Sequence, residues 1–440
     1  MARAAVIGSG PNGLSAAIAL ARAGVAVTVY EGRETVGGAV ATGELTLPGF
    51  RHDLGSSVYP LGVASPFFRS LPLGKFGLRW IEPPAPLAHP LDAEDGSAVL
   101  LEHDLAATAE GLGIDCRAYR SLMQPLGKEW ARILPEILGP VMHWPQHPLA
   151  LANFGRRAMQ PATRLAGKFQ GERARALFAG CAAHSVLPLT HAFSSAFALV
   201  LMAAGHAGGW PIAAGGAQSV ADALAGYLRS LGGRIETGRW IQTLEELEEE
   251  IVFYDLSPAG LVKMAGEALA PAYRRVLEVF QHGPGAFKVD WALSQPIPWR
   301  QTECARAATV HLGGTLKEIA AAEAAAWQGK TTERPFVLLT QSSLFDPARA
   351  PEGRHTAWGY CHVPRGYSGA ERPEEDPMLH AIEAQVERFA PGFRDCILAR
   401  HVAGPVQLEA WNPNLVGGDL SGGAMIPEQL VLRPSLSPYR

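Results

Sequence analysis

The sequence holds 440 residues, of which 48 % are hydrophobic and 18 % charged, and its formal net charge is −4. This length allows two or three domains around a large core, and the composition is that of a globular enzyme. Without a basic stripe or polybasic run, nucleic acid is not an expected partner; anionic lipid is not favoured, although peripheral membrane contact stays open. The first apolar run begins almost at Met1 and leaves no room for a leader segment, so we expect a cytoplasmic protein.

The first forty-odd residues follow the order strand, glycine turn, helix, strand and acidic residue. Residues 4–7 form an apolar run, and residues 14–21 carry an apolar face at helical spacing. The run 25–30 is rich in β-branched residues and ends at Glu31. This is the context that the dinucleotide-binding fingerprint requires. The residues expected to form the turn around the cofactor are Gly8, Gly10, Pro11, Asn12 and Gly13.

Each part of this unit has a physical task at a dinucleotide. Gly8 allows the tight turn, Gly10 lets the backbone approach a pyrophosphate, and Gly13 lets the helix pack against the strand. The helix N-terminus offers partial positive charge and free N–H groups to the diphosphate. Glu31 stands where a carboxylate accepts hydrogen bonds from the adenosine ribose, and its charge disfavours NADP. The alternative, an ordinary glycine-rich turn, is weakened because the whole unit is present.

A second glycine pair, Gly37-Gly38, favours FAD over NAD as the cofactor. Its place just past the acidic residue resembles the diglycine motif of FAD oxidoreductases such as amine oxidases and phytoene desaturases, where it touches the diphosphate and ribityl region. The resemblance extends the cofactor site to Thr42. Those proteins usually place an arginine after the glycines, whereas this chain has Ala39, so the helix dipole and backbone amides must carry more of the phosphate charge. A plain surface turn is the alternative interpretation.

Cysteines and apolar stretches narrow the chemistry further. The five cysteines stand far apart without a Cys-x-x-Cys, which excludes a flavin–disulfide relay and a cysteine-rich zinc site, and no metal is expected. The most apolar stretch, 185–205, contains Pro188 and is interpreted as a buried helix under a binding pocket rather than a membrane span. The loop 142–149 is interpreted as a cap or lid; its two histidines and Trp144 would also allow a metal or stacking site, but a third ligand is lacking.

Beyond the first unit the chain leaves the nucleotide domain and returns to it. Prolines between residues 60 and 86 mark the exit, and glycine pairs at 208–209 and 215–216 mark the return. An amphipathic helix and strands near 234–238 and 251–255 follow, and Ser257-Pro258 opens another helix.

From residue 285 the chain leaves again. The run 286–293 alternates apolar and polar residues and predicts a half-buried antiparallel strand, and the runs 335–340 and 356–363 predict further strands. Thr315 with Glu318 predicts a capping box before a helix, and a second helix begins after Asp376. We expect an antiparallel sheet flanked by helices that forms the far wall of the flavin pocket.

The predicted fold is therefore α/β: a Rossmann-like, glutathione-reductase-like FAD-binding domain interleaved with a substrate domain of mixed or antiparallel sheet and helices. The FAD-binding domain is expected to comprise residues 1–75, 208–284 and 405–440. The substrate or cap domain is expected to comprise residues 76–207 and 285–404.

Nearly the whole chain resembles the phytoene-desaturase-related FAD-dependent oxidoreductases, within them the branch named pyridine nucleotide-disulfide oxidoreductase domain-containing protein 2. The segments that carry the resemblance are Val6–Gly13, Glu31, Gly37-Gly38, Gly208–Gly216, Gly285–Leu293, His355–Pro364 and Asn412–Gly423. It implies backbone contacts to adenine near Trp240 and Ile241. It also implies a last strand, a second flavin motif and a closing helix after residues 412–419. The chain ends at Arg440 before that element, so either the sequence is a fragment or this variant has lost its second flavin clamp, and we expect FAD to be held mainly by its adenosine half.

The resemblance implies an FAD-dependent dehydrogenase, desaturase or oxidase that transfers a hydride from a mainly hydrophobic small molecule to the flavin. His362 is the candidate catalytic base, because a strand places it on the predicted pocket sheet and histidine can transfer protons near neutral pH. A structural histidine is the alternative, and His311 and Asp290 rank below it. Two rival functions stay open: an NAD-dependent dehydrogenase, against which Gly37-Gly38 counts, and a non-catalytic flavoprotein-derived protein that binds a partner.

Overall fold

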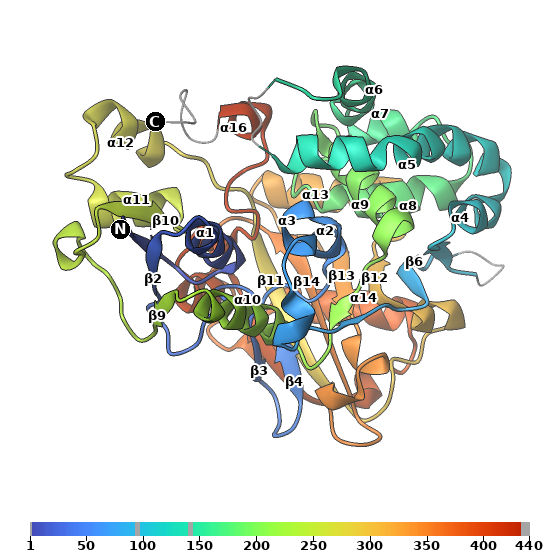
Figure 1. Ribbon diagram of the computed structural model, residues 1–440. Coiled ribbons are helices and arrows are strands. Elements are labelled where there is room, and N and C mark those ends of the chain that lie inside the picture. The colour runs from blue at the N-terminus through green and yellow to red at the C-terminus, as the bar shows by residue number, and fades with distance from the viewer. Residues whose placement is uncertain (1, 93–96, 140–143, 433–440) are drawn as a thin grey trace.

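The computed structural model describes residues 2–92, 97–139 and 144–432. His143, part of the predicted lid, and residues 438–440, on which the expectation of a missing flavin clamp rests, lie outside this part of the chain. The described residues form a smaller sheet at the left of Figure 1 and a larger sheet at its centre, with helices on both.

The smaller sheet is parallel and has the strand order β10-β1-β2-β9. Its strands are β1 (Arg3–Ile7), β2 (Ala26–Tyr30), β9 (Arg234–Glu236) and β10 (Ile251–Tyr254). Its principal helices are α1 (Pro11–Arg22) and α10 (Gln218–Ser230). Leu14, Ala17 and Ile18 have no exposed surface, so the apolar face predicted on the first helix packs into the core. The predicted Rossmann-like sheet is confirmed.

The larger sheet has seven strands in the order β15-β11-β14-β13-β12-β6-β7. They are β6 (Ala85–His89), β7 (Val99–Leu101), β11 (Gly285–Leu293), β12 (Ala307–Leu312), β13 (Val337–Thr340), β14 (His355–Val363) and β15 (Ile397–Ala403). β12 pairs with β6 in parallel and the other neighbours pair antiparallel, so the predicted mixed sheet is confirmed.

The strand β11 corrects one prediction. All nine of its residues are buried, although their alternation predicted a half-buried strand. Both its neighbours, β14 and β15, are hydrogen-bonded to it, and Lys288 and Asp290 keep 5 % and 0 % of their surface. The polar positions of the pattern therefore lie inside the molecule and not in solvent.

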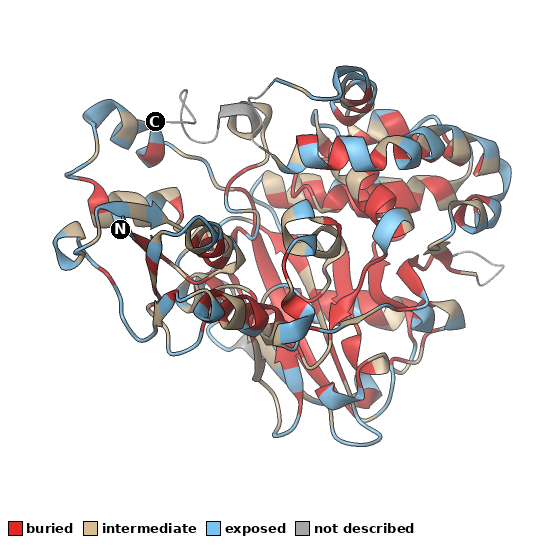
Figure 2. Cartoon of the chain, viewed as in Figure 1, coloured by how far each residue is buried: buried red, intermediate tan, exposed pale blue. Residues whose placement is uncertain are grey.

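Helices cover the two faces of the larger sheet. On one face Phe287, Val289 and Trp291 share a core with α14 (Pro377–Phe389). On the other face Leu338 shares a core with α8 (Glu172–Ala183), α9 (Ser194–Gly208) and α13 (Leu316–Trp327). Figure 2 shows that the strands and the helices lying against them are largely buried, whereas the outer helices keep exposed sides.

The apolar stretch 185–205 is not one helix. α8 ends at Ala183, residues 184–193 form a loop, and α9 begins only at Ser194. Val186 and Phe193 adopt positive φ angles in this loop, which interrupts helical hydrogen bonding. Among the described residues, none of the helices combines the length and apolarity that crossing a membrane would need.

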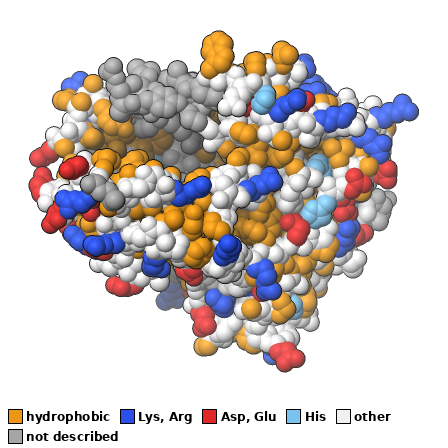
Figure 3. Space-filling model, viewed as in Figure 1, with side chains coloured by type: hydrophobic (Ala, Val, Ile, Leu, Met, Phe, Trp, Pro, Cys, Tyr) orange, Lys and Arg blue, Asp and Glu red, His pale blue; other side chains and the backbone are white. Residues whose placement is uncertain are grey.

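The remaining elements are shorter or lie on the outside. The other helices are α2 (Pro60–Ala64), α3 (Pro66–Arg69), α4 (Leu105–Gly111), α5 (Cys116–Leu138), α6 (Pro148–Ala158), α7 (Ala162–Ala166), α11 (Pro258–Ala265), α12 (Pro271–Glu278), α15 (Pro405–Trp411) and α16 (Pro427–Leu432). Two small ribbons pair β3 (Thr42–Glu44) with β4 (Arg51–Asp53) and β5 (Trp80–Ile81) with β8 (Ile212–Ala213). On the face shown in Figure 3, acidic and basic side chains are interspersed.

Gly13→Ala should lower the free energy of unfolding by about 1–3 kcal/mol, the usual effect of overpacking. A Cβ at this position would lie 2.2 Å from the Gly8 carbonyl oxygen, so the turn and the helix must move apart. Gly127→Ala in α5 is the control: nothing lies within 4 Å of its added Cβ, and alanine should stabilise the helix slightly. Urea denaturation of both variants measures the difference, and equal losses would contradict the packing role of Gly13.

Candidate cofactor and substrate site

The glycine turn between β1 and α1 is held by backbone contacts that allow no side chain. Gly8 has a φ of +102°, and its N–H donates to the carbonyl of Tyr30 across to β2. Gly10 is the N-cap of α1 and has no side chain that could cap this end, and Pro11 at the first position has no N–H. The Gly13 N–H is taken by Asp255, so the Asn12 N–H and the helix dipole are what this end can offer to an anion.

Asp255, directly after β10, lies at the same turn. Its Oδ2 accepts a hydrogen bond from the Gly13 N–H at 2.9 Å, and a Cβ built on Gly10 would lie 2.8 Å from that oxygen. Burial, and to a lesser extent the charge of Glu31, raises the pKa of Asp255. The protein therefore places one carboxylate of its own against the helix N-terminus.

Glu31 lies at the end of β2 with its carboxylate turned towards the glycine turn. Its Oε2 accepts from the Ser9 N–H at 3.0 Å and the Ser9 hydroxyl at 2.5 Å, and its Oε1 accepts from the Arg33 N–H at 3.0 Å. Ile241, the predicted adenine contact, is buried in a cluster with Tyr30 at this edge of the sheet. The structure thus brings together the residues predicted for the adenosine end.

The glycine pair Gly37-Gly38 packs against the glycine turn that precedes α1. Gly37 and Gly38 have φ angles of +127° and +58°, which favour glycine. A Cβ on Gly38 would lie 3.0 Å from the Cα of Gly10, and the Gly37 N–H donates to the carbonyl and hydroxyl of Ser9. The two motifs, distant in sequence, form one surface.

Arg33 was missed by the sequence analysis. Its guanidinium donates to the Gly38 carbonyl at 2.6 Å and lies 5.0 Å from the ring centre of Trp411. The site therefore has a cation beside the glycine pair, although Ala39 follows the glycines. The available signal was its position two residues after Glu31, in the loop that leads to Gly37.

Thr42 holds two neighbouring segments of the site together by hydrogen bonds. Its hydroxyl donates to Asp53 at 2.8 Å and accepts from the Gln218 N–H at 3.1 Å at the start of α10. The hydroxyl is thus engaged by two protein groups next to the predicted cofactor position.

A cavity of about 510 Å³ opens from the glycine motifs towards the larger sheet. Residues of the larger sheet, of the helices α1, α2, α3, α9, α10 and α15, and of the segments that connect them line it. They include Pro11, Ala39, Val40, Ser56, Ser57, Tyr59, Phe68, Trp80, His184, Leu201, Trp210, Val220, Ala286, Lys288, Thr309, Leu338, Thr340, Trp358, Tyr360, Leu408 and Trp411. Most of this lining is apolar, as is usual for a site that binds a small organic molecule.

Alternate positions of four strands form the sheet wall of the cavity. In register across β11, β14, β13 and β12, one row is Lys288, Tyr360, Leu338 and His311. The next row is Asp290, Trp358, Thr340 and Thr309. The polar alternation of these strands thus faces the cavity side.

A buried charge pair lies in these two rows. The Lys288 ammonium is 2.5 Å from Asp290 Oδ1 and 4.9 Å from the ring centre of Trp358. Burial opposes ionisation of Asp290, but Lys288 holds the pKa of this carboxyl below its usual value. His52 Nδ1 lies 3.7 Å from the same Asp290 oxygen. Asp290, a secondary catalytic candidate, is thus bound to a cation.

One histidine of the described residues lines the cavity, and His362 and His311 lie on the same face of the sheet but outside the lining. His362 Nδ1 is 2.8 Å from Glu323 Oε2, and its Nε2 is buried without a hydrogen bond to any described residue. His184, in the loop after α8, is the histidine among the described residues that lines the cavity. Its Nε2 is 3.0 Å from Nε2 of the buried His311. The catalytic role of His362 stays a prediction.

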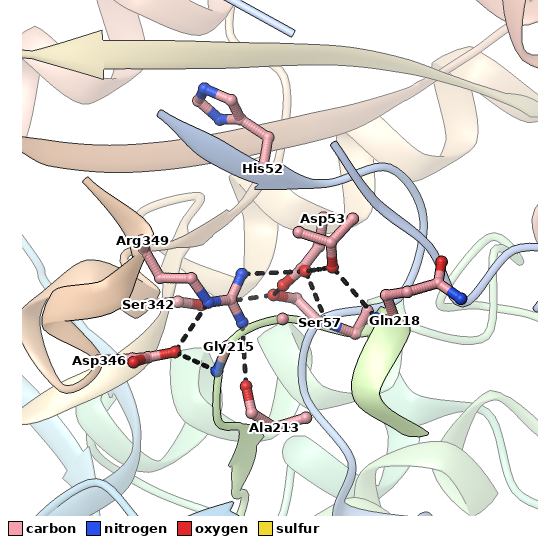
Figure 4. A network of polar contacts seen from close by, with 12 residues as sticks. His52, Asp53, Ser57, Ala213, Gly215, Gln218, Ser342, Asp346 and Arg349 are labelled. Atoms are coloured by element: carbon pink, nitrogen blue, oxygen red, sulfur yellow. Dashed lines mark hydrogen bonds and ion pairs between the residues drawn. The ribbon is translucent and has the colours of Figure 1, made fainter. Parts of the chain in front are cut away.

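A network around Arg349 ties together three segments beside the cavity (Figure 4). The guanidinium lies between Asp53 at 2.9 Å and Asp346 at 3.0 Å, and it also donates to the Ala213 carbonyl. Arg349 keeps 1 % of its surface. Ser57, which lines the cavity, donates its hydroxyl to Asp53, while His52 points away from the network.

The chain is similar to known nucleotide-binding oxidoreductases. Residues 6–71 match a family model described as an NAD(P)-binding Rossmann-like domain. The chain is 26 % identical to mouse pyridine nucleotide-disulfide oxidoreductase domain-containing protein 2, over 99 % of this chain and 87 % of the mouse protein. A shorter match, 37 % identical, covers 24 % of this chain and 19 % of a limonene dehydrogenase polypeptide from Castellaniella defragrans.

Solved structures share the fold. A structure of putrescine oxidase has a TM-score of 0.58 and 17 % identity, and the match covers 93 % of this chain and 86 % of that chain. At this level of identity the likeness concerns the fold. The comparisons confirm the predicted fold and the predicted resemblance, and they agree with FAD as the cofactor.

Arg349→Met should lower the free energy of unfolding by about 3–5 kcal/mol, because Asp53 and Asp346 would stay buried without their cation. Arg372→Met is the matched control, since Arg372 forms an exposed ion pair with Glu375 and such pairs contribute little. Urea denaturation compares the two variants. Equal midpoints for both would show that the network does not hold these segments.

Acidification should destabilise the fold because buried histidines are neutral in it. Burial lowers the pKa of His52 and of His89 to about 4, whereas an unfolded histidine binds its proton near pH 6.5. Between these values the unfolded state holds more protons, so the unfolding free energy falls as the pH drops, by about 1.4 kcal/mol per pH unit for each such histidine. Denaturation from pH 7 to 5 measures the slope; His89→Gln should reduce it by one proton, and an unchanged slope would contradict the assignment.

Proposed function

We propose that this chain is an FAD-dependent oxidoreductase that passes a hydride from a mainly hydrophobic small molecule to the flavin. One observation carries the proposal. Gly38 lies against Gly10 at the N-terminus of α1, and the same corner opens into an apolar cavity of about 510 Å³ that extends to the larger sheet. A dinucleotide bound at the glycines would therefore reach into a space suited to an apolar molecule.

The residues of this corner fit the adenosine and diphosphate parts of FAD. The Asn12 N–H and the dipole at the start of α1, together with the guanidinium of Arg33, suit the diphosphate, and the Glu31 carboxylate suits the ribose hydroxyls. Backbone approach is possible because neither Gly10 nor Gly38 carries a side chain. Asp255 adds a negative charge behind the turn, which makes Arg33 the necessary counter-charge beside the phosphates.

FAD, when bound, supplies the hydride acceptor, and the chain supplies binding, orientation and exclusion of water. Leu201, Trp210 and Leu338 make the inner wall apolar. Lys288 brings a positive charge to this wall, and its pairing with Asp290 keeps the wall close to neutral. His362 lies on the cavity face of the sheet but outside the cavity lining, beside Glu323, so its proposed role as a base would require a group that lines the cavity to relay the proton.

An apolar substrate is favoured over an amine. Limonene dehydrogenase is named for an apolar substrate and putrescine oxidase for a diamine. The described cavity lining contains Lys288 and no carboxylate, so an ammonium group would meet a cation and find no counter-charge. This charge pattern supports the hydrophobic alternative.

The test is a visible absorption spectrum of the purified protein. We expect the yellow spectrum of oxidised flavin, and bleaching of that spectrum when an apolar substrate such as limonene is added without oxygen. A colourless protein that binds NAD would contradict the proposal in favour of a nicotinamide dehydrogenase. A yellow protein that no apolar compound bleaches would favour a non-catalytic binding protein.

The variant Glu31→Ala tests whether FAD binds at the glycine turn and not elsewhere on the protein. Loss of charge-assisted hydrogen bonds to the ribose should weaken FAD binding by about 1–3 kcal/mol. Glu34→Ala removes an exposed carboxylate from the same loop and should leave the affinity unchanged. Titration of the apo-protein with FAD measures both, and equal affinities would remove Glu31 from the site.

A further inference from the structure

The sheet wall of the cavity carries polar atoms without a partner among the described residues. The Tyr360 hydroxyl and His184 Nδ1 belong to residues that line the cavity and keep part of their surface, and neither atom has a hydrogen-bond partner among the described residues. Nearby, Thr309 Oγ1 and Trp358 Nε1 are buried and equally unpaired. Buried polar groups are normally satisfied, so a wall with several open ones points to a ligand.

The hydrogen bond between two histidines decides which proton faces the cavity. His184 Nε2 and His311 Nε2 are 3.0 Å apart, so one nitrogen donates and the other accepts. His311 Nδ1 is buried against the backbone of Gly180 and has no hydrogen-bond partner within the described ranges. An orphaned N–H is rarer than an orphaned lone pair, which assigns the His311 proton to Nε2. His184 then accepts at Nε2 and carries its own proton on Nδ1, which faces the cavity.

Tyr360 is a donor for a separate reason. Its hydroxyl has no acceptor in the described part of the chain, and burial raises its pKa, so the hydroxyl keeps its proton at physiological pH. Burial likewise lowers the pKa of His184 to about 3, with His362 adding to the effect, so the imidazole is neutral. The cavity therefore presents two neutral donors.

The two donors share one part of the cavity. Tyr360 and His311 occupy the same row of the sheet, on β14 and β12 with Leu338 between them, and His184 is hydrogen-bonded to His311. The Tyr360 ring also lies 5.6 Å from the ring of His362, whose charge would act on His184. Apolar groups, Leu201 and Leu338 among them, line the same wall.

We propose that this part of the cavity binds a neutral oxygen atom, a ketone or hydroxyl group, of an otherwise apolar substrate through the Tyr360 hydroxyl and His184 Nδ1. The inference rests on the proposed function in that it names the substrate class of the same site. A neutral oxygen matches two neutral donors. A carboxylate would enter an apolar wall whose cation, Lys288, is already paired with Asp290. An ammonium group offers these donors nothing to bind.

The test compares four ligands of equal chain length: 2-heptanone, heptane, heptanoate and heptylamine. Binding is followed by quenching of tryptophan fluorescence, because Trp210 and Trp358 line the cavity. The experiment uses the full chain, and its flavin content is recorded for each preparation. In the wild type we expect 2-heptanone to bind more tightly than heptanoate or heptylamine.

Tyr360→Phe removes only the hydroxyl and should weaken 2-heptanone about fivefold to tenfold, the effect of one hydrogen bond, while heptane binding stays unchanged. His184→Leu should produce the same selective loss; if that variant does not fold, Tyr360→Phe alone decides. Tyr367→Phe is the matched control, because that hydroxyl donates to Asp376 and Tyr367 is not part of the cavity lining.

The outcomes separate this inference from the proposed function. If flavin is bound and bleached but Tyr360→Phe binds 2-heptanone as the wild type does, the inference is overturned and the function stands. Tightest binding of heptanoate or heptylamine also overturns it. If the protein holds no flavin, yet Tyr360→Phe selectively loses the ketone, the oxygen site stands and the cofactor proposal fails.

Discussion

The arrangement of the cavity depends on one buried arginine. Its walls come from segments far apart in the chain, so contacts between side chains must set their relative positions. Arg349 joins Asp53, next to the cavity residue Ser57, to Asp346 and to the Ala213 carbonyl just before α10. Burying these charges is costly, and the set is stable only when it is complete. The network therefore fixes these segments of the cavity against one another more than it adds net stability.

The cofactor end of the site could be predicted because its constraints are local. Gly13 must be glycine since a Cβ would lie 2.2 Å from an oxygen five residues earlier, and Glu31 follows the second strand directly. Asp255 could not be found in this way, because its contact with the turn spans 242 residues. Arg33 could have been predicted from its place two residues after Glu31, but the arginine was expected directly after the glycine pair, where the chain has Ala39.

The cavity wall on the larger sheet was harder to predict. A strand that faces an internal cavity shows the same alternation of polar and apolar residues as a strand that faces solvent. Lys288 and Asp290 alternate with apolar residues, and this pattern indicated a half-exposed strand. Both residues are buried in the structure, because β11 is paired with a strand on each side. His362 stood out because a strand carries it. His184 lies in the break after α8, where no periodicity marks a residue, and only the folded chain brings it to the cavity.

The smaller sheet has a further consequence for behaviour in concentrated solution. β10 is an edge strand in the described part of the chain, and its outward residues Ile251 and Phe253 keep 42 % and 39 % of their surface. Such an edge is a template on which a second copy can pair. The acidic run 245–250 immediately precedes it, so two copies meeting there would bring like charges together. This repulsion between the acidic runs weakens as ionic strength rises, so two copies should pair less readily at low salt.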